Sequence, residues 1–162
     1  MSYVCFYTII ALVAGVALAS QAAINSQLAK AMGNEPLVAT FISFGTGTLL
    51  LLVISLLKTD LIGHLSSATQ HAWWKYIGGA LGALVVFTTI LLSPKMGITN
   101  MLFFIIVGQL IAAMVIDHYG LIHMPVREVN LFKFIGIVIV GIGLIIFSLV
   151  INSRNFFNNI AV

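Results

Sequence analysis

Five long stretches of the sequence contain no Asp, Glu, Lys or Arg, and this spacing of charge restricts the fold more than any other feature. They are residues 1–29, 36–57, 76–94, 96–116 and 134–153. The apolar core of a bilayer is about 30 Å thick, so a helix that rises about 1.5 Å per residue crosses it in about 20 residues. Continuous Leu, Ile and Val runs are typical of such helices, whereas barrel strands alternate apolar and polar residues. The sequence therefore predicts an all-α integral membrane protein.

The overall composition argues against a water-soluble fold. The chain is 61% hydrophobic and 7% charged, whereas soluble domains are roughly 45–50% apolar and about 25% charged. Its net charge of +3 comes from basic residues that stand singly at the ends of apolar runs, the usual place for cations that flank membrane helices. No basic cluster is present that would neutralise several phosphates, so nucleic acid is not a predicted partner.

We predict one transmembrane domain, residues 1–162, that crosses the bilayer five times. The expected helices are 3–29, 37–57, 73–92, 98–116 and 131–151. Tight turns with Gly and Pro should join the first helix to the second and the third to the fourth, at 32–36 and 93–97. Polar loops are expected at 58–70 and 117–130, and the tail from residue 152 is expected to be interfacial or frayed.

Lys and Arg are divided almost evenly between the two membrane faces. With five spans, the face that holds the 58–75 and 117–133 loops carries four basic residues and the opposite face carries three. Orientation is set mainly by an excess of Lys and Arg on the cytoplasmic side, so a difference of one leaves insertion nearly undecided. We therefore predict dual topology, with oppositely inserted copies paired as an antiparallel homodimer of ten helices. The alternative is a monomer of fixed topology.

Several polar side chains lie inside the predicted spans. Gln21 and Asn25 are four residues apart and therefore share a helix face, and Gln109 lies at the centre of the fourth span. Polar groups within the lipid bilayer must hydrogen-bond to protein or water. These side chains therefore either line a cavity or join neighbouring helices. The residues predicted to bind a substrate are Gln21, Asn25, Ser43, Thr46 and Gln109.

Glycines and aromatic residues accompany these polar groups. Two pairs of small residues, Gly78 with Gly82 and Gly108 with Ala112, are spaced for close packing of helices. Three aromatic side chains are further candidates to line the same cavity: Phe44, Phe87 and Phe103.

Chemistry beyond hydrogen bonding is not indicated. Asp117 and His118 follow the fourth span and are interpreted either as a proton relay at the mouth of a cavity or as a solvated helix end. Asp117, His118 and His123 match no defined metal spacing, so we predict no metal ligand and no cofactor. The sequence contains no nucleophile with a positioned base and no intramembrane pair of carboxylates, so it does not predict an enzyme.

A series of short motifs runs along the whole chain. They are Gln21-x3-Asn25-x2-Leu28, Ser43-Phe44-Gly45-Thr46-Gly47-Thr48, Trp74-x3-Gly78-Gly79-x2-Gly82, Pro94-x2-Gly97 and Gly108-Gln109-Leu110-x6-Asp117-His118-Tyr119-Gly120. In order and spacing this series resembles the YdcZ family of bacterial membrane proteins, within the drug/metabolite transporter superfamily. The resemblance implies five-helix halves that occur as dual-topology proteins, as paired homologues or as fused ten-helix chains. It also implies transport across the bacterial inner membrane, without naming a substrate.

The first predicted helix lacks the glutamate of the small multidrug resistance branch of that superfamily, so proton-coupled export of cations through such a carboxylate is not expected. The predicted function is transport of a small solute through a central cavity at the antiparallel interface. The competing prediction is a non-transporting membrane subunit or scaffold that binds other membrane proteins. The expected partners are a second copy, the lipid bilayer and a small-molecule solute.

Overall fold

The computed structural model describes the backbone of residues 2–160, which is helical and contains no strand, as predicted. Side-chain surroundings are described from Tyr3 to Leu149, apart from positions 69, 144 and 148. The long helices are α1 (Ser2–Ala31), α2 (Pro36–Lys58), α4 (Ile77–Met96), α5 (Ile98–Tyr119) and α6 (Leu131–Ile160). The short elements are the helix α3 (Leu61–Ser66) and the 3₁₀ turns η1 (Ala68–Gln70), η2 (Trp73–Tyr76) and η3 (Leu121–His123).

Four helical segments in the described residues are long and apolar enough to cross a membrane. They are Tyr3–Ala31, Pro36–Lys58, Trp73–Met96 and Ile98–Tyr119. In α6 the apolar part that the structure describes, Leu131–Phe147, is shorter than these four. A fifth crossing therefore stays a prediction.

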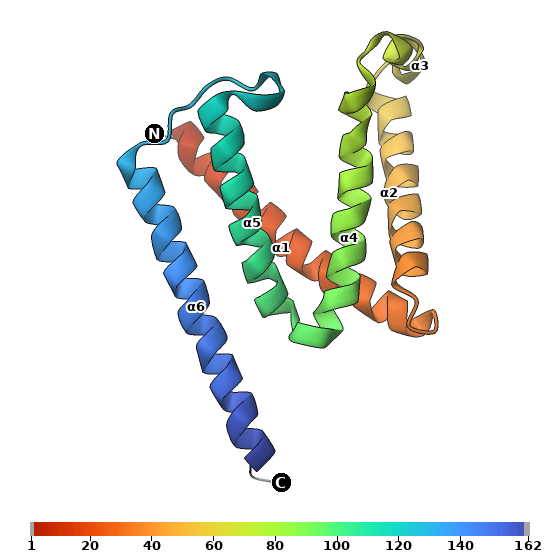
Figure 1. Ribbon diagram of the computed structural model, residues 1–162. Helices are drawn as coiled ribbons and strands as arrows, with labels where there is room; N and C mark the ends of the chain where they lie inside the picture. The colour runs from red at the N-terminus through yellow and green to blue at the C-terminus, as the bar shows by residue number, and fades with distance from the viewer. Residues whose placement is uncertain (1, 161–162) are drawn as a thin grey trace. The chain divides into compact units, whose positions relative to one another are not determined.

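Contacts between Cα atoms divide the chain into two compact units, Met1–Ile98 and Thr99–Val162. In the first unit α1, α2 and α4 contact one another pairwise, and α2 and α4 run antiparallel with α3 in the connection between them (Figure 1). The core of this unit consists of Ala29, Ala39 and Ile90. Because two of these three side chains are alanines, the helix backbones approach closely, as is usual in membrane helix pairs.

Only the last third of α1 is packed in this core. The buried residues of α1 are Ala22, Asn25, Ser26 and Ala29. Their spacing of three and four positions places them on one helix face. Residues 3–18 are all exposed, so burial of α1 begins where it meets α2 and α4.

The second unit is a pair of helices, α5 and α6. The rings of Phe103 and Phe147 stack between them with centroids 4.9 Å apart. The connection folds back on α5, because the Arg127 N–H donates to the Asp117 carbonyl at 2.8 Å. Asn130 then caps α6, since its Oδ1 accepts a hydrogen bond from the Lys133 N–H at 2.9 Å.

The turn predicted at 93–97 is wrong, because α4 continues through Met96 with Pro94 inside it. Pro94 provides no N–H to the Ile90 carbonyl and would disrupt many helices. In an apolar environment, however, the other backbone groups find no partner outside the helix, so membrane helices tolerate proline. Only Gly97, with φ of 79°, separates α4 from α5. Its N–H donates to the Ser93 carbonyl at 3.0 Å.

One other connection and one helix end differ from the prediction. The polar loop expected at 58–70 contains α3 and η1. Asp60 caps α3, because its carboxylate accepts a hydrogen bond from the Gly63 N–H at 3.1 Å. The last helix was expected to end at residue 151 and instead continues through Ile160.

Candidate functional site

Asn25 and Ser43, two of the predicted substrate-binding residues, bond directly to each other. The Asn25 side-chain amide of α1 donates to the Ser43 hydroxyl oxygen of α2 at 3.0 Å. Asn25 is 5% exposed and Ser43 is half-buried. This contact corresponds to the interpretation in which polar groups join neighbouring helices. It leaves Asn25 little surface for a solute.

Gln21 and Thr46 lie nearby on the same two helices, but both are exposed. Gln21 shares a face with Asn25 by spacing, yet it precedes the packed part of α1 that begins at Ala22. The Thr46 hydroxyl donates to carbonyls of its own helix, Ile42 at 3.1 Å and Ser43 at 2.9 Å. Gln21 is therefore the predicted residue of the first unit whose polar group is most open to a partner from outside.

Gln109 lies in α5 of the second unit and is also exposed. It is roughly 15 Å from each end of this helix at about 1.5 Å per residue. Such a depth is beyond the headgroups, and lipid chains offer an amide no hydrogen bond. The exposed Gln109 amide therefore requires a partner from water or from another polypeptide.

Most of the predicted close glycine contacts are absent from the described structure. A methyl group added at Gly78 or at Gly108 would have no atom within 4 Å. At Gly82 it would lie 3.6 Å from Cζ of Phe44, an ordinary contact distance. The small-residue faces of α4 and α5 are thus left unfilled within their own units.

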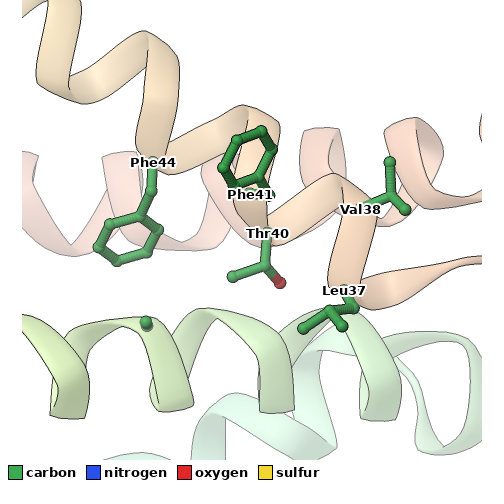
Figure 2. A pocket seen from close by; sticks show the side chains of 6 residues that line it. Leu37, Val38, Thr40, Phe41 and Phe44 are labelled. Atoms are coloured by element: carbon green, nitrogen blue, oxygen red, sulfur yellow. The ribbon is translucent and has the colours of Figure 1, made fainter.

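A cavity beside α2 is lined by five residues of this helix, among them Phe44, and by Ala83 of α4 (Figure 2). Figure 2 shows Leu37, Thr40 and Phe44 turned toward α4, whereas Phe41 and Val38 point away from it. The volume is about 530 Å³, and the lining is apolar except for Thr40. The Thr40 hydroxyl donates to the Pro36 carbonyl at 2.8 Å. This cavity accepts apolar groups and offers almost no recognition of polar ones.

A second cavity of the first unit lies between the C-terminal parts of α1 and α4, and its volume is about 310 Å³. Its polar lining comprises Ser26, Gln27 and Lys30 from α1 and Ser93 from α4. Ser93 is 5% exposed, and its Oγ has no hydrogen-bond partner in the described residues. An unmade hydrogen bond of this kind costs about 1–3 kcal/mol.

Sequence reasoning missed these residues as part of a site. Ser93 was assigned to a turn because of Pro94, and Ser26 is one of many single serines in apolar helices. The signal available was that Ser26 and Lys30 are four residues apart and so lie on one face.

In the second unit Asp117 and His118 line different cavities. Asp117 lines one of about 460 Å³ between α5 and α6, together with Lys133. His118 lines another, where its Nδ1 accepts a long hydrogen bond from the Val129 N–H at 3.4 Å. Successive residues of a helix point about 100° apart, which places the two side chains on different faces. The proton relay stays a prediction that no contact between the two supports.

Long apolar helices, few buried residues and polar groups exposed at mid-span together define a helical membrane protein. Comparison with known families identifies which one. The model of the family described as "Putative inner membrane exporter, YdcZ" matches residues 6–146. The chain belongs to this family and is an inner-membrane protein. The family description favours a transporter over an enzyme. No curated protein and no solved structure matches the chain closely enough to compare.

Proposed function

We propose that the chain is the five-span half of an antiparallel homodimer that exports a small solute through a polar cavity at the dimer interface. The family description supports export in general terms. The near-even division of Lys and Arg between the membrane faces supports insertion in both orientations.

The observation that carries the proposal is the exposure of amides deep in the membrane. Gln109 is exposed at the middle of α5, and Gln21 is exposed roughly 15 Å from the end of α1. An amide in contact with lipid alone would leave both its donors and its acceptor unsatisfied. A water-filled cavity shared with a second copy provides partners for both groups, and solute binding replaces that water.

The unfilled glycine faces provide independent support for a second copy. Methyl groups added at Gly45, Gly47, Gly78 or Gly79 would have no atom within 4 Å among the described residues of their own unit. Small residues are typical of surfaces where membrane helices of different chains pack closely. An antiparallel partner would bury faces that the single chain leaves open.

Cysteine labelling tests whether the exposed amides face water. The native Cys5 is exposed and must first be replaced by serine. In that background Gln21→Cys and Gln109→Cys should react with a water-soluble, membrane-impermeant thiol reagent. Val16→Cys and Ile111→Cys are matched controls, because these apolar residues are 68% and 48% exposed on α1 and α5 and lie on other helix faces than the two glutamines.

The proposal expects both glutamine positions to react much faster than both controls. Equal, slow reaction at all four positions would indicate helices surrounded by lipid or by a dry protein interface. That result would remove the cavity and favour the scaffold function. Faster reaction at the controls than at the glutamines would likewise contradict it.

Topology reporters test the antiparallel arrangement separately. A reporter fused after Val162 should be found on both sides of the membrane. Replacement of the exposed Gln70 and His71 by lysine raises the basic residues on one face from four to six. This change should produce a single orientation. A single orientation in the unmodified protein would contradict dual topology.

A further inference from the structure

The cavity between the ends of α1 and α4 has a polar wall with one positive charge and three groups that can donate hydrogen bonds. Among the described residues, Lys30 is its only charged lining residue and no carboxylate lines it. Ser26 and Ser93 are 8% and 5% exposed, and Gln27 completes the polar set. An ammonium group has three donors and no acceptor, whereas hydroxyl and amide groups can both donate and accept, so Lys30 is the group that favours an anion.

Ser93 indicates that this wall lacks a partner. Its Oγ is buried without a hydrogen bond in the described residues, although most buried polar atoms in proteins are paired. Serines in helices commonly bond to a carbonyl of the preceding turn, as Ser20 does to Val16 at 2.9 Å. The hydroxyl of Ser93 makes no such bond in the described residues, and Ser93 lines the cavity.

The rest of the lining is apolar. Ala23 and Ile24 of α1 and Pro94 and Ile98 near the end of α4 complete the cavity. The cavity has a volume of about 310 Å³. A ligand that matches this lining has one end that accepts hydrogen bonds and carries negative charge and another end that is apolar.

We infer that this cavity binds an oxyanion, a carboxylate or phosphate attached to an apolar group, with Lys30 and Ser93 as its principal donors. Lys30 occupies the last turn of α1, near the membrane surface, where an anion arrives from water or belongs to a lipid headgroup. The site lies within the first unit and does not require a dimer.

Binding is measured by calorimetry on the purified full chain in neutral detergent. Benzoate is the probe, and benzamide, which has the same shape without the charge, is the matched ligand. Benzoate should bind saturably, and benzamide at least about tenfold more weakly, the factor expected from a charge-assisted hydrogen bond. Detergent removes any influence of the lysine count on membrane orientation.

Matched variants identify the donors. Lys30→Gln and Ser93→Ala should each raise the Kd for benzoate, the first by about tenfold. Lys58→Gln and Ser20→Ala should leave it unchanged, since Lys58 also occupies the last turn of a long helix and neither residue lines the cavity. Each variant must retain the elution volume and helical circular dichroism of the parent.

Nanodiscs separate the two sources of the anion. Lys30-dependent binding of benzoate in phosphatidylcholine discs identifies a free anion as the ligand. If benzoate binds in phosphatidylcholine discs but is excluded in discs that contain phosphatidylglycerol, the headgroup occupies the site. Absence of saturable binding in both detergent and nanodiscs would overturn the inference. An equal loss of affinity for benzoate in Lys30→Gln and Lys58→Gln would also overturn the inference.

Discussion

Removal of the hydrogen bond between Asn25 and Ser43 tests a polar contact that the structure places between α1 and α2. We expect Ser43→Ala to destabilise the protein, because it leaves the amide of the 5%-exposed Asn25 without this acceptor. A buried donor left unpaired costs about 1–3 kcal/mol. The Asn25→Ala change removes the same bond and also creates a cavity, so its cost should be at least as large.

The double variant isolates the bond itself. Hydrogen bonds between membrane helices contribute about 0.6 kcal/mol on average and about 1.7 kcal/mol at most. These coupling energies correspond to factors of about 3 and about 18 in the unfolding equilibrium. The losses in free energy of unfolding caused by the two single substitutions should therefore add up to more than the loss caused by the double substitution, by about 0.6 to 1.7 kcal/mol.

The assay is equilibrium unfolding in mixed micelles, followed by the loss of helical circular dichroism. Thr46→Ala provides a control, since the Thr46 hydroxyl bonds only to its own helix in α2. Its coupling to Asn25 should be close to zero. A coupling between Asn25 and Ser43 that is also zero would refute the reasoning. The amide would then be free to face a solute.

Four further substitutions have expected outcomes. Ile90→Ala should lower the free energy of unfolding by about 2–5 kcal/mol, because this 1%-exposed side chain lies where α1, α2 and α4 meet. Gly97→Ala should cost about 1–3 kcal/mol in the same assay, because φ is 79° there, whereas Gly82→Ala should be nearly neutral. Asn130→Ala should remove the cap that accepts from the Lys133 N–H, cost about 1 kcal/mol and speed hydrogen exchange in the first turn of α6.

The spacing of charges predicted the helices well because burial in lipid depends on composition over a whole segment. The end of α4 was mispredicted because Pro94 has a different consequence in an apolar environment. In water the carbonyl of Ile90 could bond to solvent and the helix could end there. In lipid the helix retains its remaining bonds and continues to Met96.

The candidate site was less predictable because it depends on where helices cross. Spacing alone placed Gln21 and Asn25 on one face, but only the part of α1 from Ala22 is packed. One amide is therefore buried in a helix contact and the other is exposed. The unpaired hydroxyl of Ser93 depends on the packing of α4 against α1, and no local pattern in the sequence specifies that contact.

Complementation between two biased variants distinguishes an antiparallel dimer from a parallel one. Gln70→Lys with His71→Lys favours one orientation, with six basic residues against three. The opposite orientation is favoured by a triple variant with Lys58→Gln, Lys75→Gln and Met32→Lys. This variant has two basic residues on the first face and four on the second.

If the two-fold axis lies in the membrane plane, neither variant can pair with itself, but each can pair with the other. A tagged copy of one variant should therefore retain an untagged copy of the other through purification in neutral detergent, and should not retain its own kind. Retention within one variant alone would mean that the interface joins copies of the same orientation. The exposed amides of Gln21 and Gln109 would then need a different explanation.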